Sequence, residues 1–389
     1  MSLCSQAGLN DAQIALQEMT LEFARRELAP LASLWDRDKI FPVETLRAAA
    51  SLGMAAIYVR EELGGAGLSR HDAALIFEAL STGCPAIAAY LSIHNMCAGI
   101  IDAYGSAEQQ RRRLPQLVTM ETLTSYCLTE PACGSDAAAL RTKAVKDGEF
   151  YYLTGEKQFI SGAGAGGDAH LYIVMARTGE AGPRGISAIL VEGDAPGMTL
   201  GVNERKMGWN AQPTRSVSFQ DCRVPVSNLL GKEGDGFKIA MSALDGGRLN
   251  IGACSLGGAA RALAAAREYV QQREAFGRPL SEFQSLQFRL ADMATELEAA
   301  RALLWRAAAA LDSGHADATR LCAMAKRIAT DTGFSVVDDA LQLFGGYGYL
   351  ADYGVEKLLR DLRVHRILEG TNEIMRLIVA RELLGERNS

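Results

Sequence analysis

The chain has 389 residues, of which 48% are hydrophobic and 22% charged, so it is long enough for two or three packed units of an ordinary globular protein. Its formal net charge of −6 argues against a nucleic-acid partner, because such binders usually carry a basic surplus. The eight cysteines form no CxxC pair, which gives no support to a zinc ribbon or a thioredoxin-like motif and predicts reduced, mostly buried thiols. We expect no metal site.

The first ten residues, MSLCSQAGLN, contain neither a basic segment with an apolar core nor the arginines of a transit peptide. We therefore expect a bacterial cytoplasmic protein, or the mature form of a protein of the mitochondrial matrix. The longest stretch without Asp, Glu, Lys or Arg runs from Leu80 to Ile101 and contains Pro85, His94 and Asn95. It predicts a buried helix pair rather than insertion into a membrane.

Residues 1–122 are predicted to form a helical domain. Asn10 with Gln13 is typical of a capping box, and apolar residues follow at steps of three and four as far as Phe23. The character of the sequence changes near Thr122, where glycine, threonine and serine begin to separate short β-branched and aromatic runs.

Residues 123–235 are predicted to form a β domain. Asp147-Gly148 is a hairpin signal, and runs such as LYIVMART and SVSFQDCRV follow one another without helices between them. This order favours an antiparallel barrel or sandwich over a parallel sheet. The glycines of GAGAGG satisfy the letters of GxGxxG, but a strand pattern follows instead of a helix, so we predict a β-hairpin loop and no dinucleotide-binding fingerprint.

Residues 236–389 are predicted to be helical, because stretches such as RALAAAREYVQQREAF are rich in strong helix formers. The expected fold class is therefore α+β. It has an N-terminal helical domain, a middle antiparallel β-barrel-like domain and a C-terminal domain resembling a four-helix bundle.

Three segments contain residues suited to chemistry. The first, YCLTEPACGSD (126–136), offers hydroxyl groups in a loop that contains a glycine. The second, QLFGGYGYLADYGVEKLLRD (342–361), contains a glycine turn whose N–H groups can bind a phosphate. Each segment by itself is also typical of an ordinary connection. HRILEGTNEIMR (365–376) places Glu369 between Leu368 and Gly370. Such a carboxylate is a stray surface charge, a partner for a buried cation, or a base.

Taken together, these segments resemble the two signature patterns of the acyl-CoA dehydrogenases, which are FAD enzymes. CLTEPACGSD resembles the first pattern, with Cys133 where a smaller residue is usual, and the segment 342–361 resembles the second. The resemblance extends along essentially the whole chain. The segments SIHNMC, GWNAQPTR, LADMAT and FGGYGYL are most similar to the members that act on isobutyryl-CoA in valine degradation.

The resemblance implies that Glu369 removes the α proton of an acyl-CoA thioester while the N5 atom of FAD takes the β hydride. Some members carry this base in the segment corresponding to LDGGR, where the present chain has Gly247. Burial among apolar neighbours should raise the pKa of Glu369 towards working pH. The backbone N–H of Glu369 is implied as a donor to the thioester oxygen, and Gly370 as a residue lining the substrate.

The resemblance also implies which residues bind FAD, in two groups. The first lies near the flavin ring and at the start of the last helix: Leu128, Thr129, Gly134, Ser135, Phe159, Ile160, Ser161, Thr371 and Glu373. The second reaches the FAD of a neighbouring subunit: Arg273, Phe276, Gln284, Gln342, Leu343, Gly345 and Gly346. A cofactor shared by two chains implies an oligomer, and the family is usually tetrameric.

For the CoA moiety, the resemblance implies contacts from Ser135, Asp245, Arg248 and Arg381, although Asp245 and Arg248 are equally typical of an i,i+3 helix ion pair. The implied electron acceptor is electron-transfer flavoprotein. The alternatives are a dehydrogenase for butyryl- or 2-methylbutyryl-CoA, an acyl-CoA oxidase, whose usual extra C-terminal region we do not find, and a non-catalytic nucleic-acid-associated homologue. We interpret His94 and His365 as packed, hydrogen-bonded residues rather than as acids or bases.

Overall fold

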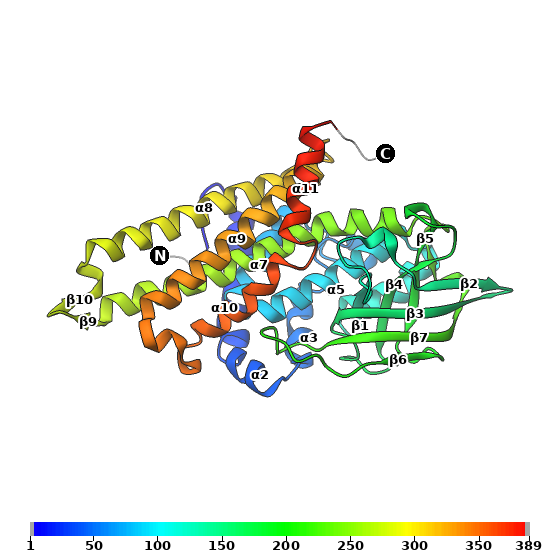
Figure 1. The fold of residues 1–389 in the computed structure, drawn as a ribbon, viewed down its shortest axis with the longest axis horizontal. Coiled ribbons are helices and arrows are strands. Elements are labelled where there is room, and N and C mark those ends of the chain that lie inside the picture. Colours follow the sequence, from blue (N-terminus) through cyan, green and yellow to red (C-terminus); the bar gives the residue numbers. More distant parts are fainter. Residues whose placement is uncertain (1–3, 386–389) are drawn as a thin grey trace.

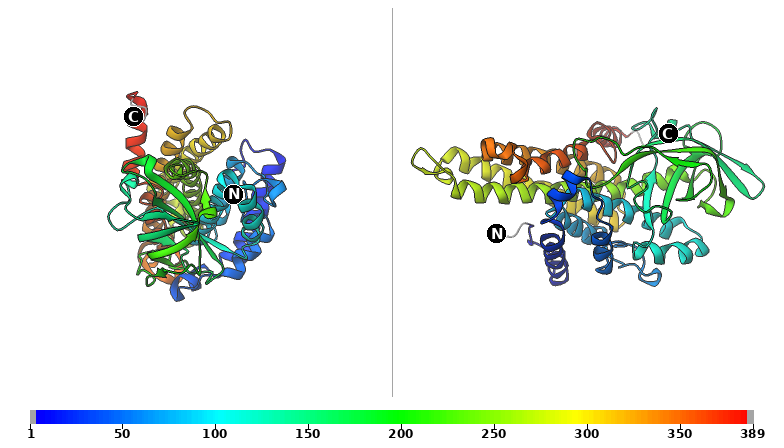
Figure 2. Two further views of the ribbon diagram at one scale, coloured as in Figure 1. Left: turned by 90° about the vertical axis from the view of Figure 1, so that its right-hand side faces the viewer. Right: turned by 90° about the horizontal axis from the view of Figure 1, so that it is seen from below.

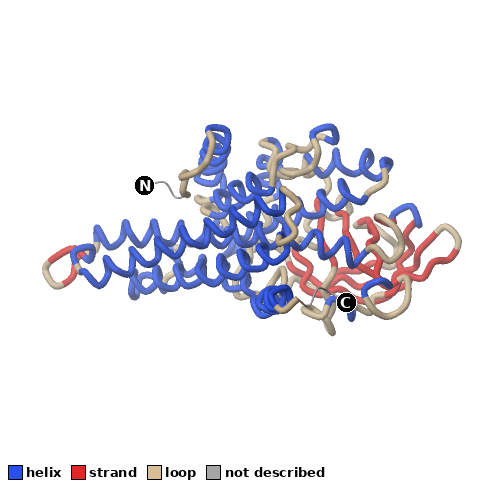
Figure 3. Tube along the Cα trace, turned by 90° about the horizontal axis from the view of Figure 1, so that it is seen from above, coloured by secondary structure: helices blue, strands red, loops and turns tan. Residues whose placement is uncertain are grey.

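The computed structural model describes residues 4–385. Helices fill the centre and one end of an elongated molecule, and the strands are gathered at the other end (Figures 1 and 3). The helices before the sheet are α1 (Asp11–Phe23), α2 (Ala32–Asp38), α3 (Val43–Ser51), α4 (Arg70–Ser81), α5 (Pro85–Tyr104) and α6 (Ala107–Val118). The predicted capping box is present, since the Asn10 side chain accepts from the N–H of Gln13 and the Gln13 side chain accepts from that of Asn10.

Helix α5 is long and apolar enough to cross a membrane by length and composition alone. Most of its residues are buried, and α4, α6, α7 and strand β1 pack around it. The stretch that we predicted as a buried helix pair is therefore the end of α4 followed by α5. All eight cysteines are free and buried, also as predicted.

The middle of the chain forms one eight-stranded sheet with the order β6-β7-β3-β2-β4-β5-β8, and β1 pairs with β4. Its strands are β1 (Leu123–Cys127), β2 (Lys143–Asp147), β3 (Phe150–Ser161), β4 (His170–Arg177), β5 (Ile186–Glu192), β6 (Met198–Leu200), β7 (Thr214–Pro225) and β8 (Leu229–Leu230). The sheet is largely antiparallel, and the turn at Asp147-Gly148 joins β2 to β3 as predicted.

Two details of the sheet differ from the sequence prediction. Strand β4 pairs in parallel with β1 and, at one position, with β2, so the sheet is not purely antiparallel. The GAGAGG segment connects β3 to β4, which are not neighbours in the sheet, so it is a crossover loop and the predicted hairpin was wrong. The strand-to-strand connection itself, which excludes the dinucleotide fingerprint, is confirmed.

The C-terminal part is built from long helices, with a two-stranded β9–β10 ribbon at its tip (Figure 1). Its elements are α7 (Gly236–Gln272), β9 (Glu274–Ala275), β10 (Arg278–Pro279), α8 (Gln284–Asp312), α9 (Ala318–Phe344), α10 (Val355–Arg363) and α11 (Asn372–Leu383). Helix α7 is the central element, because it packs against α4, α5, α8 and α9. The N-terminal helices lie along one side of this bundle (Figure 2).

Glycine and alanine make up much of the buried surface of α7, which brings neighbouring backbones close to it. At Gly257 an added Cβ would collide with the carbonyl of Glu78 on α4. Overpacking of this kind typically costs about 1–3 kcal/mol, so the small residues of α7 fix the contact between the N-terminal and C-terminal helices. This contact sets the position of α7, against which the candidate site is built.

Candidate active site

Glu369 lies in a tight turn between a 3-10 segment, Val364–Arg366, and helix α11. Its φ is +54° and that of Gly370 is +88°, so two consecutive residues adopt left-handed conformations. A left-handed conformation strains a non-glycine residue by of order 1–3 kcal/mol, and such strain persists only where surrounding contacts impose it. Thr371 then caps α11 by accepting from the N–H of Ile374 at 3.3 Å.

Buried cations hold both carbonyl groups of this turn. Arg248 Nε on α7 lies 3.4 Å from the carbonyl oxygen of Glu369, and Lys326 Nζ on α9 donates to that of Gly370 at 2.8 Å. Among the described residues, no intrachain acceptor takes the N–H of Glu369. That N–H is therefore available to a ligand oxygen.

The Glu369 side chain lies against helix α7 at Gly247. An added Cβ on Gly247 would lie 2.6 Å from Oε2 of Glu369, so a side chain at 247 and the carboxylate at 369 cannot occupy this space together. Oε2 is buried, and within residues 4–385 it has no hydrogen-bond partner. The residue as a whole is half-buried, so its exposed part lies outside the carboxylate oxygen Oε2.

Burial raises the pKa of Glu369 to about 7, while the charges of Arg248 and Lys326 act in the opposite direction. Desolvation is the larger effect because it removes water from a carboxylate that has no hydrogen-bond donor. The direction is the one expected from its apolar neighbours. A carboxylate with a pKa near 7 is suited to accept a proton at neutral pH.

Buried groups on strand β1 and helix α5 lie near enough to Glu369 for its charge to act on them. Burial and, to a smaller extent, the nearby charge of Glu369 raise the pKa of Tyr126 on β1 well above its ordinary value. Burial likewise raises the pKa of Cys97 on α5 to about 12, and Glu369 adds to the rise. Neither residue was among those predicted from the sequence, because only the fold brings them to Glu369.

The predicted residues of the β domain are held together beside β3. Lys157 on β3 donates to the carbonyl of Leu128 at 3.1 Å and pairs with Glu130 at 2.8 Å, and the N–H of Gln158 donates to the carbonyl of Thr129 at 2.8 Å. Gly134 and Ser135, farther along the same loop, are exposed.

Strand β3 also presents an aromatic ring to the surface next to these loops. Phe159 has a φ of +61° and is 65% exposed, which is unusual for a phenylalanine. The next residue, Ile160, is buried, and the carbonyl of Ser161 accepts from Ser125 Oγ at 2.7 Å. A strained, exposed ring on a well-anchored strand is suited to contact a flat ligand.

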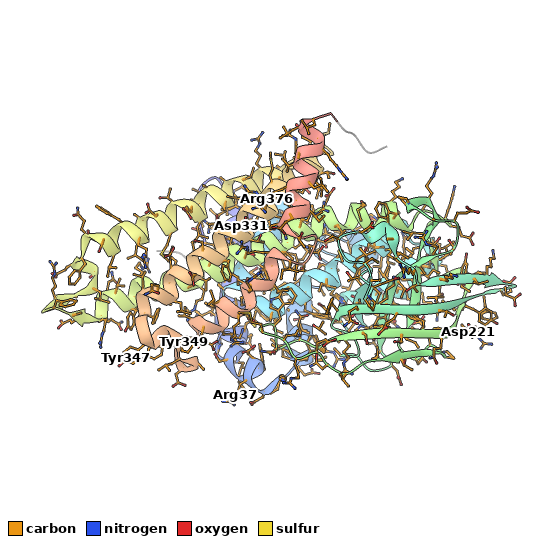
Figure 4. All side chains as sticks on the ribbon, in the orientation of Figure 1. Arg37, Asp221, Asp331, Tyr347, Tyr349 and Arg376 are labelled. Carbon is orange, nitrogen blue, oxygen red and sulfur yellow. The ribbon has the colours of Figure 1, made fainter. Side chains whose placement is uncertain are left out.

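The second predicted group lies at the far tip of the helical bundle, around β9, β10 and the end of α9 (Figure 1). Phe276 has a φ of +53° and is 94% exposed, and the Arg273 guanidinium lies 5.7 Å from the ring centre of Tyr347. Gln284, Gln342, Gly345 and Gly346 are also exposed, whereas Leu343 is buried. The Tyr347 label in Figure 4 marks this region, remote from the sheet.

The glycines of the second group have room for a ligand beside them. Gly345 has a φ of +59° with ψ of −136°, a conformation open to glycine, and an added Cβ on either Gly345 or Gly346 would meet no atom within 4 Å. The second group lies at the end of the helical bundle that is remote from the sheet, whereas the first group lies on β3 and the loops beside it, so the two groups are well separated within one chain (Figure 1).

Asp245 and Arg248 form the i,i+3 ion pair that the sequence left open, with Oδ1 and Nη1 2.6 Å apart, and Thr319 donates to the other carboxylate oxygen of Asp245 at 2.7 Å. A contact from either residue to CoA stays a prediction. Glu373 and Arg381 on α11 are exposed.

Both histidines are packed and hydrogen-bonded, as predicted. His94 Nε2 lies 2.9 Å from the carbonyl oxygen of Leu117, and His365 accepts from Trp209 Nε1 at 3.2 Å and contacts Ser255 Oγ at 2.7 Å. Burial lowers the pKa of His94 to about 4 and that of His365 to about 3. Both rings are therefore neutral at physiological pH.

Comparison with known proteins identifies the family. Sequence models of the acyl-CoA dehydrogenase N-terminal, middle and C-terminal domains match residues 10–121, 125–222 and 234–384. The chain belongs to the acyl-CoA dehydrogenase family. It is therefore an oxidoreductase that carries out FAD-dependent dehydrogenation of acyl-CoA thioesters.

Individual relatives cover nearly the whole chain. It is 58% identical to the mitochondrial isobutyryl-CoA dehydrogenase of Dictyostelium discoideum and 53% identical to that of Bos taurus, in both cases over 97% of this chain and 90% of the relative. Its fold matches the three-dimensional structure of butyryl-CoA dehydrogenase from Megasphaera elsdenii with a TM-score of 0.93 and 39% identity, over 98% of this chain and 100% of that one.

The residues present fit FAD. The β3 surface offers an exposed aromatic ring beside anchored loops, and the tip of the bundle offers an arginine, an exposed phenylalanine and a glycine turn with open space around it. An arginine suits a diphosphate, and aromatic rings suit the flat isoalloxazine and adenine systems. The two predicted groups are therefore chemically suited to the two halves of a dinucleotide.

Proposed function

We propose that this dehydrogenase acts on a short branched acyl-CoA, with isobutyryl-CoA as the favoured substrate, and that Glu369 is its base. Identities of 58% and 53% with two relatives named isobutyryl-CoA dehydrogenase support the substrate. The observation that carries the assignment of the base is the Glu369 carboxylate itself, with its buried, unpartnered Oε2 and a pKa of about 7.

Glu369 accepts the proton that leaves the α carbon of the acyl group. The electron pair of the broken α C–H bond forms the new α,β double bond, and the β hydrogen leaves with its own electron pair. Bound FAD supplies the acceptor for that hydride. Because the Glu369 carboxylate starts without a hydrogen-bond donor at Oε2, no donor has to be released before it takes the proton.

The turn supplies a second contribution through the backbone. The N–H of Glu369 is free of intrachain acceptors within the described residues, and it can donate to the thioester oxygen while negative charge develops there. Donors fixed before the reaction stabilise such charge with little reorganisation. Arg248 and Lys326 hold the neighbouring carbonyls, so this N–H belongs to a fixed turn.

Two protomers contribute to each FAD in this proposal. Leu128, Thr129, Phe159, Ile160 and Ser161 hold the flavin side, with Thr371 and Glu373 nearby, and Arg273 and Phe276 of a second copy hold the diphosphate and adenine side. The separation of the two groups within one chain supports an oligomer, and a tetramer is the state usual for the family. We infer that the protein passes its electrons to electron-transfer flavoprotein, and that it works in a bacterial cytoplasm or, like the relatives described as mitochondrial, in the matrix.

A substrate panel tests the proposal. Purified flavoprotein is mixed with isobutyryl-, butyryl-, 2-methylbutyryl- and isovaleryl-CoA, and kcat/KM is measured with a dye or electron-transfer flavoprotein as acceptor. Because one methylene is worth only about 1–3 kcal/mol of discrimination, preferences of roughly 10–200-fold are expected, with isobutyryl-CoA highest. A higher kcat/KM for butyryl-CoA would reassign the substrate, and oxygen uptake as fast as dye reduction would indicate an oxidase.

A further inference from the structure

Lys326, on α9, is one of three buried lysines in the described chain, and it differs from the other two in its surroundings. Lys157 pairs with Glu130 at 2.8 Å and Lys357 pairs with Asp361 at 2.6 Å. Among residues 4–385, no carboxylate lies within 4.0 Å of Lys326 Nζ, although its side chain is completely buried. Burying an ammonium without an ion pair is costly, so the position of Lys326 needs an explanation.

The Lys326 ammonium instead binds two oxygen atoms at the start of α11. Nζ donates to the carbonyl of Gly370 at 2.8 Å and to Oδ1 of Asn372 at 2.9 Å. Asn372 is itself fixed, because its amide donates to Thr330 at 3.0 Å and to Asp331 at 2.9 Å. Asp331 lies next to Arg376 where α9 meets α11, as the two labels in Figure 4 show.

These bonds end at the strained turn that carries Glu369. Gly370 is the second of the two consecutive left-handed residues, and Lys326 on α9 donates a hydrogen bond to its carbonyl oxygen. Arg248 on α7 donates to the carbonyl oxygen of Glu369. The turn is therefore clamped between two helices by two cations, and a clamp of this kind can impose the left-handed conformation of Glu369.

We propose that Lys326 is a positioning residue for the reaction: its ammonium clamps the Gly370 carbonyl, fixes the left-handed turn and so sets the Glu369 carboxylate against helix α7. The inference rests on the proposed role of Glu369. Lys326 also acts through its charge, which favours the ionised form of the Glu369 carboxyl and opposes the effect of burial on its pKa. Burial lowers the pKa of Lys326 itself to about 7, and Glu369 is the first of the charges that counteract this shift.

Other titratable and charged groups face this pair from the elements packed around it. They are Arg248 on α7, Asp331 on α9, Glu373 on α11, His365 in the 3-10 segment, Tyr126 on β1 and Cys97 on α5. Tyr126, Cys97 and His365 keep their charge constant between pH 6 and 9, because burial moves their pKa values away from this range. A change of pH profile in this range therefore reports on Glu369 and Lys326.

The experiment compares three flavoproteins by anaerobic mixing with saturating isobutyryl-CoA between pH 6 and 9. Lys326→Met removes the donor and the charge, whereas Lys326→Gln removes the charge and keeps a donor for the Gly370 carbonyl. We expect Lys326→Met to lower the limiting rate of flavin bleaching at least about tenfold and to move the midpoint of the pH profile upward. Lys326→Gln should show the same upward shift with a limiting rate clearly above that of Lys326→Met.

Lys357→Met is the matched control, because it also removes a buried lysine but lies in α10, paired with Asp361. It should lower the melting temperature without moving the midpoint of the pH profile. The inference is overturned if Lys326→Met keeps the wild-type limiting rate and midpoint, or if Lys326→Gln is no faster than Lys326→Met. If Lys326→Met does not fold, Asn372→Ala replaces it in the experiment. This variant removes one of the two acceptors of the Lys326 ammonium and should lower the limiting rate of flavin bleaching. An unchanged rate overturns the inference.

A second readout does not depend on turnover. Melting temperatures of the wild type, Lys326→Met, Glu369→Gln and the double variant form a double-mutant cycle at pH 7, where Lys326 and Glu369 are both partly ionised. We expect the two changes to be non-additive, with Lys326→Met less harmful when residue 369 is neutral, and additive effects would contradict the coupling. If no acyl-CoA bleaches the flavin of the wild type, the proposed function is refuted. If the flavins of the wild type and of Lys326→Met are bleached equally fast, only this inference is refuted.

Discussion

Replacing Glu369 by glutamine should stabilise the protein at pH 8 and have little effect at pH 5. Glutamine has nearly the same shape and stays neutral, whereas the buried carboxyl has a pKa of about 7 against an ordinary 4.5. A carboxyl whose pKa is raised on folding binds more protons in the folded than in the unfolded state between these two values. Stability is therefore lost as the pH rises from 4.5 to 7, and the loss is complete above 7.

The size of the effect follows from the two pKa values. At about 1.4 kcal/mol per pH unit, ionised Glu369 lowers the free energy of unfolding by about 3 kcal/mol at pH 8 and by under about 1 kcal/mol at pH 5. An unfolding entropy of about 2.1 cal/mol/K per residue, taken over 389 residues, turns 3 kcal/mol into a rise of about 4 °C in melting temperature.

Calorimetric or fluorescence melting of wild type and Glu369→Gln at equal flavin content measures this difference at both pH values. Glu44→Gln serves as the control, because the Glu44 side chain on α3 is 86% exposed and its neutralisation should give no pH-dependent change. If Glu369→Gln shifts the melting temperature equally at pH 5 and pH 8, the carboxylate is not desolvated in the folded protein and the reasoning fails.

Three further changes test other parts of the structure. Gly247→Ala places a Cβ 2.6 Å from Oε2 of Glu369, so flavin bleaching by isobutyryl-CoA should slow at least about tenfold at an unchanged melting temperature, and an unaltered rate would contradict the contact. Arg301→Met leaves the buried Glu78 without its partner at 2.8 Å, so the free energy of unfolding should fall by about 3–5 kcal/mol in thermal unfolding. The double variant Arg301→Met/Glu78→Leu should recover most of this stability. Equal losses in the single and double variants would argue against the ion pair. Phe276→Asp alters a ring that is 94% exposed in one chain, so absorbance and sedimentation should show less bound FAD and a smaller assembly, and a fully loaded, full-sized oligomer would count against cofactor sharing.

The sequence predicted the three-part architecture because each part has its own periodicity. The capping box at Asn10 and the hairpin turn at Asp147-Gly148 are local signals, and both are present. The parallel pairing of β1 with β4 has no local signal, because it joins Leu123 to His170 across two intervening strands. For the same reason the loop between β3 and β4 was predicted as a hairpin, although the two strands are not neighbours.

The candidate site was predictable where its residues lie in one continuous segment, as around Glu369. Its surroundings were not, because Gly247, Tyr126 and Lys326 come from three other elements that only packing brings together. A lysine within the apolar helical stretch LCAMAKRIA was a signal that we did not use. The roles assigned to individual site residues remain predictions for the variants described above.

Anaerobic rapid mixing of wild type and Glu369→Gln with saturating isobutyryl-CoA, followed by flavin absorbance, tests the central claim most directly. The glutamine variant keeps the shape of the site and cannot accept the α proton. The bleaching rate should therefore fall by roughly 10²–10⁴-fold while bound flavin and substrate affinity are retained. A Glu369→Gln protein that bleaches as fast as the wild type would contradict the role of Glu369 as the base.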